Sequence, residues 1–220
     1  GSAHAIASGR VSYVLGVQGP CASYDTACSA GLVSVHAASS ALALGEARSG
    51  LAAGVNLMLL PAVSVSCAVA GMTSARGRCH TFDDRADGYA RSEACVAFVL
   101  RQRDDWPRGT LSLGGSSVRA DGRSASLTAP NGQAQQALRT ASHVRAGMTP
   151  AELTSAEAHG TGTALGDPIE AGSYAAVAHA FGGGASAAMG SVKANLGHSE
   201  PAAGTAGLLM LAMKLDASQA

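Results

Sequence analysis

The sequence has little charge, few aromatic residues and no excess of either sign. Charged side chains make up 14% and aromatic ones 4% of the 220 residues, whereas an average soluble domain is roughly 25% charged. The 15 basic residues balance the 15 acidic ones, which removes the general attraction to phosphate on which nucleic-acid binding mostly depends. We therefore expect no nucleic-acid partner. The shortage of charge predicts a surface that is partly covered, by a second copy of the chain or by further polypeptide.

Cysteine pairs at metal-binding spacing are also missing. The five cysteines are odd in number and include no C-x-x-C pair, which argues against a disulfide framework and against a zinc site of the usual spacing. We expect a reducing compartment, the cytoplasm, and leave import into an organelle open. Residues 1–10 lack the charged and apolar regions of a secretory signal, so the sequence reads as the middle of a longer protein.

A long uncharged stretch, residues 49–75, resembles a membrane span in hydropathy alone. Several polar residues and one proline interrupt it. A buried strand over Leu51–Leu60, followed by a short apolar turn or helix, explains the same residues. We therefore expect no membrane span. Since 47% of the chain is hydrophobic and its net charge is zero, disorder is excluded as well.

Strand-like and helix-like segments alternate, which predicts an α/β fold with a mainly parallel, covered sheet. Thr149-Pro150-Ala151-Glu152 and Asp167-Pro168-Ile169-Glu170 each combine a capping side chain, a first-turn proline and a glutamate, and so predict helix starts. The polar stretch Arg101–Gly109 divides the chain into two α/β parts, residues 1–107 and 108–220. The expected strands are Ala22–Thr26, Leu51–Leu60, Cys95–Leu100, Thr110–Val118, Thr154–Ala158 and Ala188–Val192; the expected helices run from Ser29 to a stop at Gly45 or Gly50 and over Ala134–Arg145, Ile169–Phe181 and Ala202–Leu215.

Three predicted strand-to-helix junctions carry reactive side chains, at the sheet edge where ligands of α/β proteins usually bind. Cys28 immediately precedes the helix that starts near Ser29, where unpaired N–H groups and the helix dipole favour a thiolate. His159 opens a glycine- and threonine-rich loop, and His198 lies in a second loop between a strand and a helix. A buried, inert cysteine and a structural histidine are the alternatives at these positions. Their recurrence at equivalent junctions favours a shared catalytic site.

Other residues of these loops are expected to assist. The hydroxyls of Thr161 and Thr163 are suited to hydrogen-bond an amide-bearing ligand. Lys193 and Glu200 flank His198 closely enough to pair with each other and hold its loop. The loop at 160–166 lacks the lysine of a P-loop and the spacing of a dinucleotide site.

Around these residues the sequence resembles the β-ketoacyl synthase family, the condensing enzymes of fatty-acid and polyketide synthesis. The matching motifs cover nearly the whole chain, and the form DTACSAG around Cys28 is similar to multidomain polyketide synthases or a single-domain relative. The resemblance implies a thiolase-like layered α/β/α/β/α fold with two pseudo-symmetric halves. The motifs, in the family's order, are GPCASYDTACSAG, GVNLML, GRCHTFDDRADGYARSEA, LTAPNGQAQ, EAHGTGTALGDPIE and GSVKANLGHSEPAAGTAGLL.

The resemblance also implies a reaction, decarboxylative Claisen condensation. Cys28 would take an acyl chain from the phosphopantetheine of an acyl carrier protein, and His159 and His198 would bind the malonyl thioester. Lys193, paired with Glu200, would orient the His198 loop, while Thr161 and Thr163 would contact the pantetheine arm. The resemblance implies no directly bound cofactor or metal. It does imply a homodimer. Thiolases use a second cysteine and initiating enzymes pair histidine with asparagine, so two histidines indicate chain elongation.

The chain departs from the family in places. Arg91-Ser92-Glu93-Ala94 stands where RGEG is common, and the two added side chains are expected to crowd a tight backbone. Pro201 replaces a common alanine, which the first turn of a helix tolerates. Family domains are about twice this size, so we expect a piece incomplete at both ends. A fatty-acid ketosynthase and a non-elongating scaffold or carrier-docking domain are the alternative functions.

Overall fold

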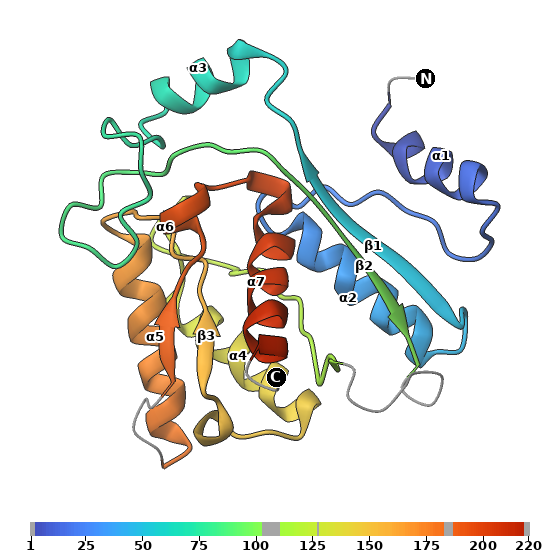
Figure 1. The fold of residues 1–220 in the computed structure, drawn as a ribbon. Helices are drawn as coiled ribbons and strands as arrows, with labels where there is room; N and C mark the ends of the chain where they lie inside the picture. The colour runs from blue at the N-terminus through green and yellow to red at the C-terminus, as the bar shows by residue number, and fades with distance from the viewer. Residues whose placement is uncertain (1–2, 103–110, 127, 183–186, 218–220) are drawn as a thin grey trace.

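The computed structural model describes residues 3–102, 111–126, 128–182 and 187–217. Helices and strands alternate along the chain (Figure 1). In chain order the elements are α1 (Ala5–Leu15), α2 (Ala30–Ala43), β1 (Ser49–Asn56), α3 (Pro61–Val69), β2 (Ala94–Arg101), α4 (Gly132–Ala146), the 3-10 turn η2 (Pro150–Glu152), β3 (Ser155–Glu157), α5 (Gly166–Ala180), β4 (Ala188–Gly190), α6 (Lys193–Leu196), η3 (Glu200–Ala202) and α7 (Ala203–Ala217).

Two small sheets flank a central helix. β1 and β2 pair antiparallel with Leu51 opposite Val99, and β3 pairs parallel with β4. Helix α2 packs on β1, and α4 packs against α5. Helix α7 lies between the sheets and contacts α2, both strands of the first sheet and β3 (Figure 1). Buried side chains therefore gather in two places, where α2 and the start of α7 meet the first sheet and along α5, which contributes Tyr174, Val177 and Ala178.

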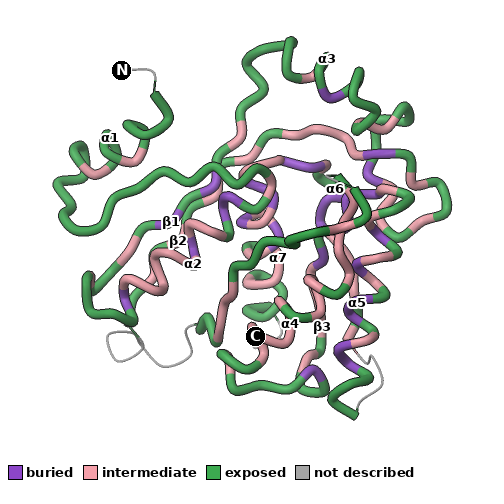
Figure 2. Tube along the Cα trace, turned by 180° about the vertical axis from the view of Figure 1, so that it is seen from behind, coloured by how far each residue is buried: buried purple, intermediate pink, exposed green. Residues whose placement is uncertain are grey.

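The edges of the molecule are open. None of the residues of α1 is buried, and the helix is exposed along most of its length in Figure 2. On the first sheet, alternate residues face outward, which leaves Leu51, Val55 and Val99 about half exposed. Among the described residues, no helix is long and apolar enough to cross a membrane.

Most predicted elements are present, and three predictions are wrong. The expected strand Ala22–Thr26 makes only an isolated bridge between Thr26 and Cys28. The expected strand at 110–118 is also missing, because residues 111–118 form no strand. In both cases a strand would need a neighbouring strand to take its backbone hydrogen bonds. Residue 110 and most of the expected boundary at 101–109 lie outside the described residues. The sheet of β1 and β2 is antiparallel, not parallel.

The two predicted helix starts differ in outcome. Thr149 forms the expected capping box with Glu152, but only a 3-10 turn follows because the chain is extended again at Leu153. Helix α5 begins at Gly166. Asp167 is therefore inside its first turn rather than at its cap.

Candidate active site

Cys28 lies on a sharp turn at the start of α2. The preceding residue, Ala27, has a left-handed φ of 52°, a conformation that is uncommon for alanine. The turn is held by Ser29, whose Oγ donates to the carbonyl of Thr26 at 2.9 Å, and by Asp25, which accepts from the Ala27 N–H at 3.3 Å. This turn places Cys28 just before the helix, with part of its surface open.

His159 follows β3, and its backbone is held by a carboxylate from α5. Glu170 accepts from the N–H groups of His159 and Gly160, both at 2.8 Å. Its Oε1 also pairs with Arg139 at 3.4 Å. The start of the loop is thereby fixed to the helix that follows it.

Asp167 holds the rest of this loop. Its side chain is buried and accepts from the N–H groups of Gly162, Thr163 and Phe82 at 2.9–3.2 Å. Three charge-assisted hydrogen bonds compensate for burying a carboxylate. Asp167 therefore joins the His159 loop to the segment around Phe82.

His198 is fixed on both sides of its backbone by the segment before β2. Its N–H donates to the carbonyl of Ala90 at 2.7 Å, and its carbonyl accepts from the Ser92 N–H at 3.0 Å. The ring of Tyr89 lies edge-on to the imidazole, with the ring centres 4.9 Å apart. The residue is only 4% exposed. The His198 imidazole is thus held rigidly.

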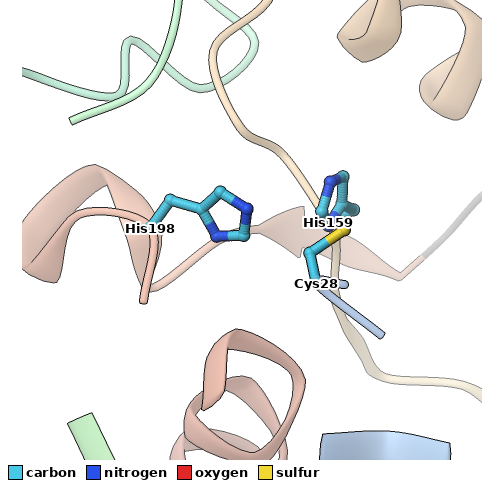
Figure 3. A group of neighbouring side chains, drawn as sticks. All are labelled: Cys28, His159 and His198. Atoms are coloured by element: carbon cyan, nitrogen blue, oxygen red, sulfur yellow. The ribbon is translucent and has the colours of Figure 1, made fainter. Parts of the chain in front are cut away.

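The three reactive side chains converge. Cys28 Sγ and one ring nitrogen each of His159 and His198 lie within 4.8 Å of one another. The two imidazole centres are 5.4 Å apart with their planes perpendicular. Figure 3 shows the His198 ring pointing toward the sulfur and the other imidazole. Residues from both parts of the chain therefore form one site.

The electrostatics keep both imidazoles neutral at physiological pH. Burial, and to a smaller extent His159 and Lys193, together lower the pKa of His198 to about 3. His159 keeps exposed surface, but desolvation of its ring by the atoms around it, followed by the charge of Lys193, also lowers its pKa, although Glu170 and Asp167 oppose this. A neutral imidazole can donate one hydrogen bond through its protonated nitrogen.

The thiolate preference expected for Cys28 is opposed in this structure. Burial raises the pKa of the thiol, and Glu200 adds to the rise. The Cys28 backbone N–H and the charge of Lys193 act in the other direction but are outweighed. The position at the helix start is as predicted, whereas the thiol form is the favoured one.

The expected pair of Lys193 and Glu200 is wrong. Glu200 instead forms a bidentate pair with Arg91, at 2.6 and 2.9 Å, and Arg91 also donates to Ser64. Lys193 is buried, and no carboxylate of the described residues lies within 4.0 Å of its ammonium. Burial lowers its pKa, and the nearby carboxylate of Glu157 opposes this most. Lys193 therefore acts on the site through its charge.

The predicted ligand-binding hydroxyls lie on the His159 loop. The oxygens of Thr161 and Thr163 are 3.5 Å apart, and Thr163 Oγ1 also accepts from the Gly166 N–H at 3.2 Å. Thr161 is buried. Both hydroxyls help to shape the loop, and their contact with a ligand stays a prediction.

The substitutions at family glycines fit without a glycine-specific backbone. Neither Ser92 nor Ala94 has a positive φ. Ser92 packs beside Gly197, where an added Cβ would come within 3.1 Å of the Ser92 Cβ. Space at this contact is therefore provided by Gly197. Pro201 is accommodated in the first turn of η3, as expected.

Sequence reasoning missed the residues that position the site, namely Arg91, Arg139, Glu157, Asp167 and Glu170. Glu157 accepts from the Val192 N–H at 2.5 Å and so joins β3 to the turn before α6. In the sequence, Glu170 and Asp167 stand out only as helix-start residues. Their partners are backbone groups outside the helix and, for Glu170, the Arg139 side chain, so the available signal is a pair of acidic residues beside a glycine-rich loop.

A cysteine at a helix start beside two imidazoles is the arrangement of an enzyme that works through a thiol nucleophile. The chain belongs to the β-ketoacyl synthase family: residues 1–105 match the N-terminal domain and residues 111–220 the C-terminal domain of beta-ketoacyl synthase. It corresponds to part of a ketosynthase domain of the polyketide synthase type.

Individual relatives agree with this assignment. Subunits C and B of the phenolphthiocerol/phthiocerol polyketide synthase of Mycobacterium tuberculosis are 46% and 45% identical to this chain. Each match covers 95% of this chain. The chain spans only 10% and 14% of the length of these two relatives.

Solved ketosynthases share the fold. The ketosynthase from module 6 of the bacillaene synthase of Bacillus subtilis 168 superposes with a TM-score of 0.89 at 36% identity, covering 96% of this chain. An oxazolomycin ketosynthase domain of Streptomyces albus gives 0.90 at 33% identity, covering 97%. The chain covers 39% of each of these structures. The fold is the thiolase-like α/β arrangement of ketosynthases.

Proposed function

We propose that this chain supplies the nucleophile and both imidazoles for decarboxylative Claisen condensation in polyketide biosynthesis. The observation that carries the proposal is the convergence of Cys28, His159 and His198 within 4.8 Å. Cys28 stands 131 positions before His159 in the chain, so the cluster depends on the fold. A thiol and two hydrogen-bond donors around one space are what acyl transfer followed by enolate formation requires.

In the first step the sulfur of Cys28 attacks the carbonyl carbon of an acyl thioester. The sulfur–carbon bond to the carrier breaks, and the proton lost by Cys28 leaves with the carrier thiol. The Cys28 N–H, at the start of α2, would help to stabilise the oxyanion formed during attack. Because the thiol form is favoured at rest, deprotonation accompanies the attack.

In the second step a malonyl-type thioester loses CO2, and the electron pair of the broken bond moves to the enolate oxygen. Hydrogen bonds from His159 and His198 stabilise this oxygen, and a neutral ring can supply such a bond through its protonated nitrogen. The carbanion attacks the acyl carbon on Cys28, and the thiolate leaves. The chain grows by two carbons.

We further propose the partners that this chemistry needs. The substrates are acyl and malonyl thioesters on the phosphopantetheine of an acyl carrier protein, with Thr161 and Thr163 against the pantetheine arm.

Residues 1–107 would form part of the N-terminal half and 108–220 part of the C-terminal half of the ketosynthase. A homodimer is proposed because the surface has little charge. Five free cysteines support action in a reducing compartment, the cytoplasm.

The experiment compares two variants of the full-length protein. Cys28→Ala is expected to abolish both acyl loading and condensation, whereas His159→Ala is expected to keep loading and to lower condensation by about 100-fold or more, on the order of the loss of an oxyanion donor. Loading is read by mass spectrometry of the Cys28 peptide, and condensation by product analysis with malonyl- and acyl-carrier thioesters.

Three results would contradict parts of the proposal. Normal condensation by His159→Ala would remove His159 from the mechanism. A wild-type protein that shows no acyl adduct on Cys28 would instead be a non-elongating scaffold. Products of fully reduced chains would indicate a fatty-acid ketosynthase, an alternative that its polyketide relatives do not favour.

A further inference from the structure

The catalytic cluster also has the composition of a metal site. Among the described residues, Cys28, His159 and His198 are the group whose sulfur and nitrogen donors all lie within 4.8 Å of one another. Thiolate and imidazole are the ligands that zinc prefers, and three protein ligands leave a fourth position open. The absence of C-x-x-C pairs in the sequence does not bear on this cluster, since its members come together only in the fold.

The geometry needs a small contraction to hold an ion. In a tetrahedral zinc site the donors lie roughly 3.3–3.8 Å apart, against an upper limit of 4.8 Å here. His198 is buried and held by Tyr89, but Cys28 is half-buried and His159 is exposed. Rotation of these two side chains can close the difference, so the rigid imidazole serves as the anchor.

The surrounding charges permit a cation. The positive charge of Lys193 lies near the cluster and opposes the binding of a cation. Arg91 neutralises Glu200 and Arg139 neutralises Glu170, which leaves Glu157 and Asp167 to balance Lys193. A bound divalent ion therefore meets no excess of positive charge.

From this arrangement we propose that Zn²⁺ binds reversibly between Cys28, His159 and His198 and thereby blocks acyl loading. The metal displaces the thiol proton, which passes to solvent, and occupies the sulfur lone pair that would attack the thioester. Metal-bound histidines usually donate their second nitrogen to a carboxylate or carbonyl. The Nδ1 of His198 is buried with no hydrogen-bond partner, so the site is expected to bind more weakly than a structural zinc site and to release the ion to a chelator.

The test measures alkylation of individual cysteines in the full-length protein by iodoacetamide, with peptide mass spectrometry as the readout. At Zn²⁺ about ten times above Kd, alkylation of Cys28 is expected to be about tenfold slower, while the exposed Cys21 in the same molecule reacts at its usual rate. His159→Ala is expected to remove the protection, and the matched variant His179→Ala, on the exposed end of α5, to retain it.

A second measurement uses only the wild-type protein, so its result does not depend on whether a variant folds. Co²⁺ added to the wild-type protein is expected to give a thiolate-to-cobalt absorption band that disappears when Cys28 is alkylated beforehand. The proposal is overturned if Zn²⁺ at concentrations up to about 1 mM leaves Cys28 alkylation unchanged; a Kd of this size corresponds to a binding free energy of only about 4 kcal/mol. It is also overturned if Cys28 and Cys21 are protected equally. Acyl loading is assayed separately with chelator present, so loss of the proposed enzyme activity and loss of metal binding are distinct results.

Discussion

At the scale of single residues, the site depends on which charges are paired. Arg91 pairs with Glu200 in a bidentate geometry, and the two flank the turn that carries His198. Lys193 stays as a buried cation that lowers the pKa of both imidazoles and opposes the rise in that of Cys28. The pairing of Lys193 with Glu200 expected from their proximity in sequence would have removed that charge. The observed arrangement keeps both histidines as neutral donors.

The depressed pKa of His198 predicts a pH-dependent stability. Its folded pKa of about 3 lies below the value of about 6.5 for a free histidine, so the unfolded chain binds more protons between these values. The stabilisation is complete above about pH 6.5 and is lost as the pH falls. We expect His198→Gln to reduce the slope of unfolding free energy against pH by about 1 kcal/mol per unit between about pH 6 and 4.

Urea unfolding of the full-length protein at a series of pH values measures this slope. His179→Gln, which replaces an exposed histidine of α5, is the control and is expected to leave the slope as in wild type. An identical slope in His198→Gln and wild type would show that the imidazole is not held neutral by burial.

At the scale of elements, the site depends on the close approach of α2 to the start of α7. Gly31, in the first turn of α2, lies against the carbonyl of Pro201 and the side chain of Thr205, which is fully buried. Gly54 of β1 lies against the same threonine. Glycine at both positions lets the helix that follows Cys28 approach the turn that follows His198. We therefore expect this contact to influence how closely the sulfur of Cys28 and the imidazole of His198 approach.

Gly31→Ala is therefore expected to disturb both stability and activity. The added Cβ would lie 2.8 Å from the Pro201 carbonyl and 2.9 Å from Thr205 Cγ2, and overpacking of this kind costs about 1–3 kcal/mol. Because Cys28 lies three residues earlier, condensation should fall as well. Thermal unfolding and the condensation assay on the full-length protein measure the two effects.

Gly172→Ala is the matched control, since this exposed helical glycine has nothing within 4 Å of an added Cβ. It is expected to raise the unfolding free energy by about 0.5–1 kcal/mol, the usual gain for alanine in a helix. Equal behaviour of the two variants would contradict the packing argument.

At the scale of the whole molecule, much apolar surface is open. The chain exposes 13526 Å², whereas a compact monomer of 21.7 kDa exposes about 9,200 Å². Leu51 and Val99, which are cross-strand neighbours on the outer face of β1 and β2, are 47% and 58% exposed. Because the chain covers 39% of solved ketosynthase structures, the remainder of such a domain has the extent to cover this face.

Leu51→Asp tests whether the face is covered in the full-length protein. In the isolated 220-residue chain the change should cost little stability and reduce aggregation, because the side chain faces water. In the full-length protein it should lower stability by a few kcal/mol, because an unpaired charge would be buried. Thermal unfolding and light scattering measure both, and equal tolerance in the two proteins would mean that the face stays exposed.

The sequence by itself determined most of the long helices and most strands, because hydrophobic periodicity and capping residues are local signals; Ser155–Glu157 and Gly166–Ala180 lie within a few residues of their predicted bounds, whereas α1 was not predicted. It also singled out Cys28, His159 and His198, because their motifs are compact. Only the tertiary structure decided which charges pair. Arg91 and Glu200 are 109 positions apart, and pairing at such a separation depends on how the elements pack, a property that no local pattern encodes. The same applies to Ala22–Thr26, whose β-prone residues find no neighbouring strand among the described residues.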